Sequence, residues 1–133
     1  MESREFEREH LEIDHVEIEH DFRIESARFL PHAATSNPCS RMHGHSFLVR
    51  LRFAGPLDPK SEWLLDFAEI RQHAEPLLRE LDHRVLNDIK GLENPTSENL
   101  CRYLYRQLKS RLPLLIQVEV SETSMTRCRY PRN

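Results

Sequence analysis

Alternation of apolar and polar residues predicts two long strands near the start of the chain. From Val16 to Ile24 every second side chain is apolar or His20, and the same parity continues to Arg28. A second alternation, from His45 to Ala54, places four large apolar side chains on one face. A period of two residues is typical of a strand with one buried face. If the proline-containing loop between them simply folds back, the two strands pair in antiparallel order.

A helical period follows in the middle of the chain. Asp66 is a favourable N-cap for a helix whose apolar residues recur every three or four positions up to Leu81. Pro76 lies inside this pattern, so we expect the helix to kink or to split into two short helices. A second helix is expected from its cap at Thr96 to about Arg111.

Two further strands are expected at the end of the chain, at Leu115–Thr123 and Arg127–Tyr130. The element order is then β-β-α-α-β-β, which predicts a two-layer α+β domain with an antiparallel sheet and helices on one face. The opposite face also carries apolar residues such as Leu48, and both outer strands have an open edge. Because open edges favour pairing, we expect subunits to join edge to edge into a closed barrel, forming a ring-shaped oligomer.

Composition narrows the function classes. The 133 residues suit one domain, which we place at 16–133 behind a charged N-terminal extension at 1–15. The net charge of −3 and the lack of a basic stripe argue against nucleic acid, and no apolar run approaches the ~18 residues of a membrane span. Three cysteines without paired spacing indicate free thiols in a reducing compartment, and we expect the cytoplasm.

Cys39, His43 and His45 lie within seven residues, where the second strand begins. The two histidines share one parity, so on an extended backbone both rings leave the same face ~6.5–7 Å apart along the strand. That spacing allows both rings to reach one metal ion, and imidazole is the usual nitrogen ligand of zinc. The alternative is a pair of surface histidines at a junction between loop and strand.

Two charged residues, Arg28 and Glu122, continue the apolar faces of the first and third expected strands. Glu122 has the parity of Ile116, Val118 and Val120. A charge directed toward a core needs a partner. Both residues are therefore candidates for a polar site.

Six short motifs lie in order from about Phe22 to the end of the chain. They are Leu30-Pro31-His32, Cys39-x-Arg41-x-His43-Gly44-His45-Ser46-Phe47, Asp66-Phe67-Ala68-Glu69, Leu81-Asp82-His83-x-x-Leu86-Asn87, Gly91-Leu92-Glu93-Asn94-Pro95-Thr96-Ser97-Glu98 and Val120-x-Glu122-Thr123. In this combination the chain resembles the 6-pyruvoyl-tetrahydropterin synthase superfamily, most closely its bacterial 6-carboxy-tetrahydropterin synthase branch. The resemblance implies the tunnelling fold (T-fold), in which three subunits close a barrel, two rings often stack into a hexamer, and active sites lie between subunits.

The resemblance also implies a chemistry. The substrate would be 7,8-dihydroneopterin triphosphate, a small-molecule pterin whose side chain is cleaved to leave 6-carboxy-tetrahydropterin, acetaldehyde and triphosphate, on the path to queuosine and other deazapurines. In this scheme Cys39 is the catalytic thiol, Asp82 and His83 form a proton relay, and Glu122 anchors the pterin ring by bidentate pairing. Asp82-His83 can also be read as a helix C-terminal turn, and Thr96, Ser97 and Glu98 either as part of the pterin site or as a helix cap. Cys101 and Cys128 are expected to be bystanders.

One position departs from the family pattern. The run Ala27-Arg28-Phe29-Leu30-Pro31-His32 has arginine where the family places its first zinc histidine. Arginine stays protonated and cannot bind a metal, so only His43 and His45 remain as expected ligands, and we expect zinc to be weak or absent. Two outcomes stay open: a weak site completed by water or His32, or a metal-free site with Arg28 in the role of the metal.

Three hypotheses for the function follow. The first is a carbon-carbon lyase of the carboxy branch. The second is a paralogue that binds pterins but has lost this chemistry, and the third is a related lyase that makes a different product. Sequence alone does not separate carboxy, pyruvoyl and hydroxymethyl products.

Overall fold

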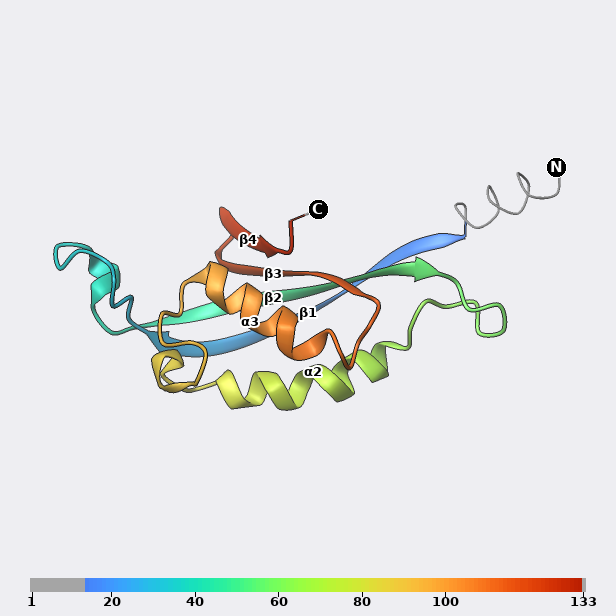
Figure 1. Ribbon diagram of the computed structural model, residues 1–133, viewed down its shortest axis with the longest axis horizontal. Helices are drawn as coiled ribbons and strands as arrows, with labels where there is room; N and C mark the ends of the chain where they lie inside the picture. The colour runs from blue at the N-terminus through green and yellow to red at the C-terminus, as the bar shows by residue number, and fades with distance from the viewer. Residues whose placement is uncertain (1–13, 133) are drawn as a thin grey trace.

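The computed structural model describes residues 14–132 and is shown in Figure 1. Its sheet has four antiparallel strands in the order β1-β2-β3-β4, and the two long helices lie together on one face of it (Figure 1). The predicted β-β-α-α-β-β order and two-layer α+β architecture are confirmed. The elements are β1 (His15–Arg28), η1 (Pro38–Ser40), β2 (His43–Pro56), α2 (Phe67–Leu81), η2 (Leu86–Asp88), α3 (Ser97–Leu108), β3 (Leu115–Thr123) and β4 (Thr126–Tyr130).

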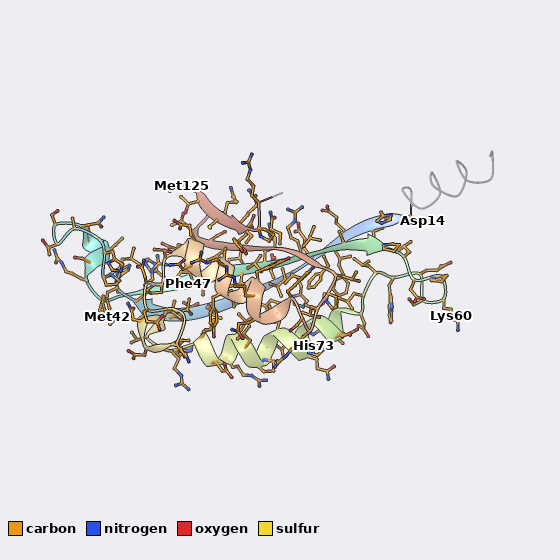
Figure 2. The ribbon with its side chains drawn as sticks, in the orientation of Figure 1. Asp14, Met42, Phe47, Lys60, His73 and Met125 are labelled. Carbon is orange, nitrogen blue, oxygen red and sulfur yellow. The ribbon has the colours of Figure 1, made fainter. Side chains whose placement is uncertain are left out.

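The core lies between the sheet and the helices. The strand register sets Ile24 opposite Phe47 and Val49 opposite Val120, so the apolar parities of three strands share the helix-facing side. Phe47, labelled in the left half of the molecule in Figure 2, is fully buried. The helices contribute the apolar residues Ile70, Ala74, Leu78 and Leu81 from α2 and Leu100, Leu104 and Leu108 from α3.

Two local features differ from expectation. Helix α2 runs through Pro76 as one helix, so of the two expected outcomes, a kink or a split, the split does not occur. Pro76 is on the exposed side while Ala74 and Leu78 are buried around it, so packing holds both halves although a backbone hydrogen bond is lost. In β3 the pairing with β2 shifts between Arg52 and Phe53, and Leu115 takes the buried position expected for Ile116. A bulge of this kind adds one residue to one strand and reverses the parity behind it.

The sheet face opposite the helices is mostly charged rather than apolar. Arg50 hydrogen-bonds both carboxylate oxygens of Asp21, at 2.8 and 3.0 Å. Glu119 is only 3% exposed, and it is ion-paired with Arg129 at 2.7 Å and with Arg50 at 3.5 Å. Leu48, expected to be apolar surface here, is half-buried among these groups.

The outer edge of β1 is partly covered within the chain itself. The backbone of Ala27 pairs with the segment that follows α2. Its N–H donates to Arg84 O at 2.9 Å, and it forms a parallel β-bridge with Val85. Ser26 Oγ donates to Leu81 O at 2.6 Å. This covering ties the end of α2 to the end of β1. Neither helix of the described region combines the length and the apolar character that crossing a bilayer requires.

Candidate active site

The predicted polar residues meet where β1 ends and β2 begins. Arg28 lies directly opposite His43 in the register, and Ser26 lies opposite His45. The rings of His43 and His45 pack edge to face with centroids 4.4 Å apart, which confirms that both leave the same face of the sheet. Glu122 of β3 reaches the same place, with its Oε2 3.9 Å from His45 Nε2.

Glu122 has two strong donors. Its Oε1 accepts an ion-paired hydrogen bond from the guanidinium of Arg28 and a second from Ser97 Oγ at 2.6 Å. Burial raises the pKa of the Glu122 carboxyl, but the hydrogen bond from Ser97 and the charge of Arg28 outweigh it and hold the pKa below its ordinary value. Glu122 is therefore ionised, and its Oε2 keeps free acceptor capacity.

Arg28 is held from several sides. Its side chain is 4% exposed, NH1 donates to Pro95 O at 2.9 Å, and the guanidinium lies 5.1 Å from the centre of the Phe47 ring. The two charged residues that the pattern directed toward the core are thus each other's partner. Arg28 Nε is buried and has no hydrogen-bond partner among the described residues.

At the start of α3, the helix cap and the contact to the candidate site are made by different residues. Thr96 is the N-cap, and its side chain accepts from Asn99 N at 3.1 Å. Ser97 instead turns its hydroxyl to Glu122. Glu122 also borders a cavity of about 220 Å³, whose lining is Ser97, Glu98, Val120, Glu122, Thr126, Arg127 and Cys128.

The residues present do not fit zinc. His43 donates from Nδ1 to Arg41 O at 2.6 Å, which leaves Nε2 for other contacts. Burial lowers the pKa of His45, and its buried Nε2 has no partner among residues 14–132. The third place around this pair is taken by the guanidinium of Arg28, while His32 is exposed in the loop. Within the described part of the chain no three His, Cys, Asp or Glu side chains are grouped so that they could hold a metal.

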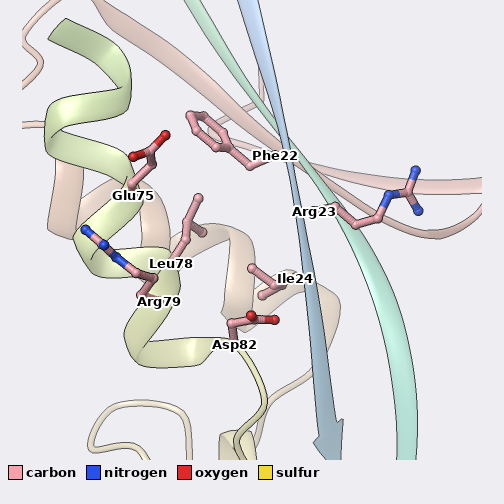
Figure 3. A pocket seen from close by; sticks show the side chains of 7 residues that line it. All are labelled: Phe22, Arg23, Ile24, Glu75, Leu78, Arg79 and Asp82. Carbon is pink, nitrogen blue, oxygen red and sulfur yellow. The ribbon is translucent and has the colours of Figure 1, made fainter. Parts of the chain in front are cut away.

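Asp82 and His83 form a hydrogen-bonded pair beside β1. His83 Nδ1 donates to Asp82 Oδ2 at 2.8 Å, and Asp82 Oδ1 accepts from the backbone N–H of Glu25 at 2.7 Å. Glu25 N–H and His83 lower the pKa of Asp82. Figure 3 shows Asp82 at the end of α2, next to Ile24 in the groove of about 210 Å³ between this helix and β1.

The backbone at His83 has φ 55°, a left-handed conformation that histidine adopts more readily than most residues. There its N–H donates to Glu25 O at 2.6 Å, and its ring is 77% exposed. His83 and His45 line one open depression of about 480 Å³, and a Cβ added at Gly44 beside it would meet nothing within 4 Å. Asp82 thus both caps α2 and orients a reachable imidazole, so the turn and the relay are compatible.

Cys39 lies in η1, on the loop that projects beyond the sheet between β1 and β2 (Figure 1). Its backbone N–H donates to Asn37 Oδ1 at 2.9 Å, and its carbonyl accepts from Leu30 N at 2.7 Å. No hydrogen bond of the described residues joins its thiol to Asp82 or His83. Within one chain, the thiol of Cys39 is therefore not hydrogen-bonded to the predicted relay of Asp82 and His83.

Sequence reasoning missed a role for Asn87. Its side chain accepts from Phe29 N at 3.0 Å and donates to Phe29 O at 2.8 Å, so it holds the base of the Cys39 loop like a strand partner. Its place in the Leu-Asp-His-x-x-Leu-Asn motif was the only available signal. By contrast, Cys101 is buried and gives its thiol to Cys128 O at 3.2 Å, and burial raises its pKa.

Comparisons with known proteins identify the family of the chain. Residues 17–133 match the family described as 6-pyruvoyl tetrahydropterin synthase. The chain is 37% identical over 116 residues to a 6-carboxy-5,6,7,8-tetrahydropterin synthase of Synechocystis, covering 83% of this chain and 88% of that protein. It is 30% identical over 82 residues to a dihydroneopterin monophosphate aldolase of Pyrococcus furiosus, covering 62% and 68%.

Among solved structures, the 6-pyruvoyl tetrahydropterin synthase of Caenorhabditis elegans superposes with a TM-score of 0.81 at 24% identity. The match covers 90% of this chain and 96% of that one, and it shows the shared fold. Three findings agree on the family: the extent of the family match, the identity to the Synechocystis protein and the common fold. The chain belongs to the 6-pyruvoyl tetrahydropterin synthase family.

Proposed function

We propose that this protein is a pterin lyase of the 6-carboxy-tetrahydropterin synthase type, acting on 7,8-dihydroneopterin triphosphate. The observation that carries the proposal is the ionised Glu122, fixed by Arg28 and Ser97 at the rim of a 220 Å³ cavity. The 37% identity to a protein with this name supports the choice of branch.

Glu122 binds the pterin ring in this proposal. The 2-amino-pyrimidinone edge presents adjacent N–H donors, which a carboxylate accepts well. Oε2 is the oxygen with free capacity, since Oε1 already accepts from Arg28 and Ser97. The ring would therefore enter from the cavity side, with the edge of Glu122 exposed there as its contact.

Asp82 and His83 carry the proton transfer. Asp82 fixes the imidazole through Nδ1, so Nε2 of the exposed ring is the nitrogen that exchanges a proton with the substrate. Cys39 is the proposed base for the side-chain proton. The overall reaction consumes one water and needs no outside oxidant or reductant, because the ring gains the two electrons that the side chain loses.

The separation of Cys39 from Asp82 and His83 suits a site shared between subunits. The part of the β1 edge at residues 16–24 and the short edge strand β4 are available to pair between copies. Met125 at the β3–β4 turn and Met42 beside η1 are 83% and 52% exposed, and both point outward in Figure 2. A homotrimer or a hexamer of stacked rings would cover these surfaces and bring a neighbour's Cys39 loop to the relay.

Incubation with 7,8-dihydroneopterin triphosphate and mass spectrometry of the products test the proposal. The expected products are 6-carboxy-tetrahydropterin and acetaldehyde. Tight pterin binding with only unreacted substrate returned would favour the paralogue without this chemistry. A different pterin product would favour the third hypothesis, for which the similarity to an aldolase acting on dihydroneopterin monophosphate is the specific motive.

A further inference from the structure

Position 28 is one corner of a triangle of side chains on the helix-facing side of the sheet. Residue 28 lies directly opposite His43, and His45 is two residues further along the same strand. Side chains directly opposite in an antiparallel pair have Cβ atoms ~4.5–5.5 Å apart, and those two apart on a strand lie ~7 Å apart. Three histidines at these corners would supply the three nitrogens of an open tetrahedral zinc site. The backbone is thus suited to zinc, and the side chain at position 28 is not.

Arg28 is not free to leave this corner. Its guanidinium donates to Pro95 O at 2.9 Å, is ion-paired with Glu122, and packs over the ring of Phe47. It cannot act as a ligand, because it has no lone pair to give while protonated.

Two buried polar atoms of this corner, Arg28 Nε and His45 Nε2, have no hydrogen-bond partner among the described residues, although His45 Nε2 lies 3.9 Å from Glu122 Oε2. Buried polar groups are nearly always satisfied in folded proteins, and each exception calls for an explanation such as a ligand. Arg28 Nε carries a hydrogen and can only donate. Its partner must therefore be an acceptor, such as an oxygen atom of a ligand.

We infer that this protein works without zinc at this site and that the Arg28 guanidinium is the fixed cation of this corner, donating to oxygens of the bound pterin side chain. The absence of zinc is inferred from the geometry of residues 28, 43 and 45 alone. The hydrogen bonds from Arg28 to the pterin side chain rest on the proposed function. Arg28 would thus hold the carboxylate that receives the ring and the oxygens of the side chain at once.

Zinc content distinguishes a zinc-bound from a zinc-free site without any pterin. Four proteins are purified with added zinc, dialysed and measured by elemental analysis. They are wild type, Arg28→His, His45→Ala and the double variant Arg28→His/His45→Ala. Arg28→His should hold about one more zinc per chain than its double variant. Wild type should hold no more than His45→Ala, which also accounts for zinc bound elsewhere on the chain.

The inference is overturned if wild type holds about one zinc more than His45→Ala, or if folded Arg28→His gains none. Circular dichroism and urea unfolding check that Arg28→His folds. If it does not, cobalt(II) titration of wild type decides: tetrahedral d–d absorption that His45→Ala abolishes overturns the inference, and its absence supports it.

The role of the guanidinium is tested by affinity for 7,8-dihydroneopterin in the presence of a chelator. Wild-type affinity should not change when the chelator is added, and Arg28→Met should bind at least about tenfold more weakly, as expected for a lost hydrogen bond from a charged donor. Unchanged affinity of Arg28→Met would remove Arg28 from the ligand site. Because the zinc measurements use no substrate, failure of the proposed function leaves their outcome intact.

Discussion

Replacing Glu122 by glutamine tests the proposed pterin anchor with a change of one atom. Glutamine keeps the shape of the side chain, so an oxygen can still accept from Ser97 at its present 2.6 Å. The free Oε2, however, is replaced by an NH₂ group that faces the N–H donors of the pterin edge. The variant loses at least one charge-assisted hydrogen bond to the ring, worth about 1.5–3 kcal/mol, which corresponds to about a 10- to 150-fold higher Kd.

The same change removes the counterion of Arg28. Removing one partner of a fully buried ion pair costs about 3–5 kcal/mol of stability. Glu122 is 24% exposed, and Arg28 keeps its bond to Pro95 O, so we expect a smaller loss, about 1–3 kcal/mol in the free energy of unfolding.

The assay is isothermal titration with 7,8-dihydroneopterin, under conditions where urea unfolding shows the variant fully folded. Glu19→Gln is the matched control: it makes the same chemical change at an ion-paired carboxylate that is 44% exposed on the opposite sheet face. The control should bind like wild type. A Kd for Glu122→Gln within about threefold of wild type, less than one hydrogen bond would give, would show that the ring docks elsewhere.

Three further predictions concern the thiol, its loop and the assembly. Cys39→Ala should abolish turnover and leave dihydroneopterin affinity unchanged, because Glu122 holds the ring; turnover within a few-fold of wild type would exclude Cys39 from the mechanism. Asn87→Ala should lower turnover and increase proteolysis of the 29–42 loop while pterin affinity stays near wild type, because Asn87 makes two hydrogen bonds to Phe29. The control is Asn99→Ala, which removes a bond to Asn94 O at 2.8 Å outside this loop. Unchanged proteolysis of the loop in Asn87→Ala would show that Asn87 does not hold it. Sedimentation should show a trimer or hexamer, and a monodisperse monomer would contradict both the barrel and the shared site.

The strands and helices could be predicted because each carries its own period in the sequence. Arg28 and Glu122 could likewise be recognised as charges that needed partners. That they pair with each other could not, because they are 94 positions apart and the contact depends on the register of three strands. The placement of Ser97 on Glu122, with Thr96 as the cap, depends on how α3 approaches β3.

Other features follow from tertiary packing that no local pattern encodes. The bulge near Ile116 is set by how β3 pairs with β2, and α2 stays whole across Pro76 because buried residues hold it on both sides. The covering of the β1 edge by Arg84 and Val85 also joins distant segments. These contacts hold the segment of Asp82 and His83 against the end of β1. The sequence motif therefore identified the two residues but not the contacts that position them.

The proposed lyase reaction is tested most directly by the ratio of acetaldehyde to triphosphate released from 7,8-dihydroneopterin triphosphate, followed over time with a chelator present. A carboxy product leaves one carbon of the side chain on the ring, so we expect equal amounts of acetaldehyde and triphosphate, and no release from Cys39→Ala. Triphosphate without acetaldehyde would mean that the side-chain carbons are retained, as in a pyruvoyl product, and would contradict the proposed reaction. Release of neither, from protein that binds the pterin, would contradict the assignment of this chemistry to the chain.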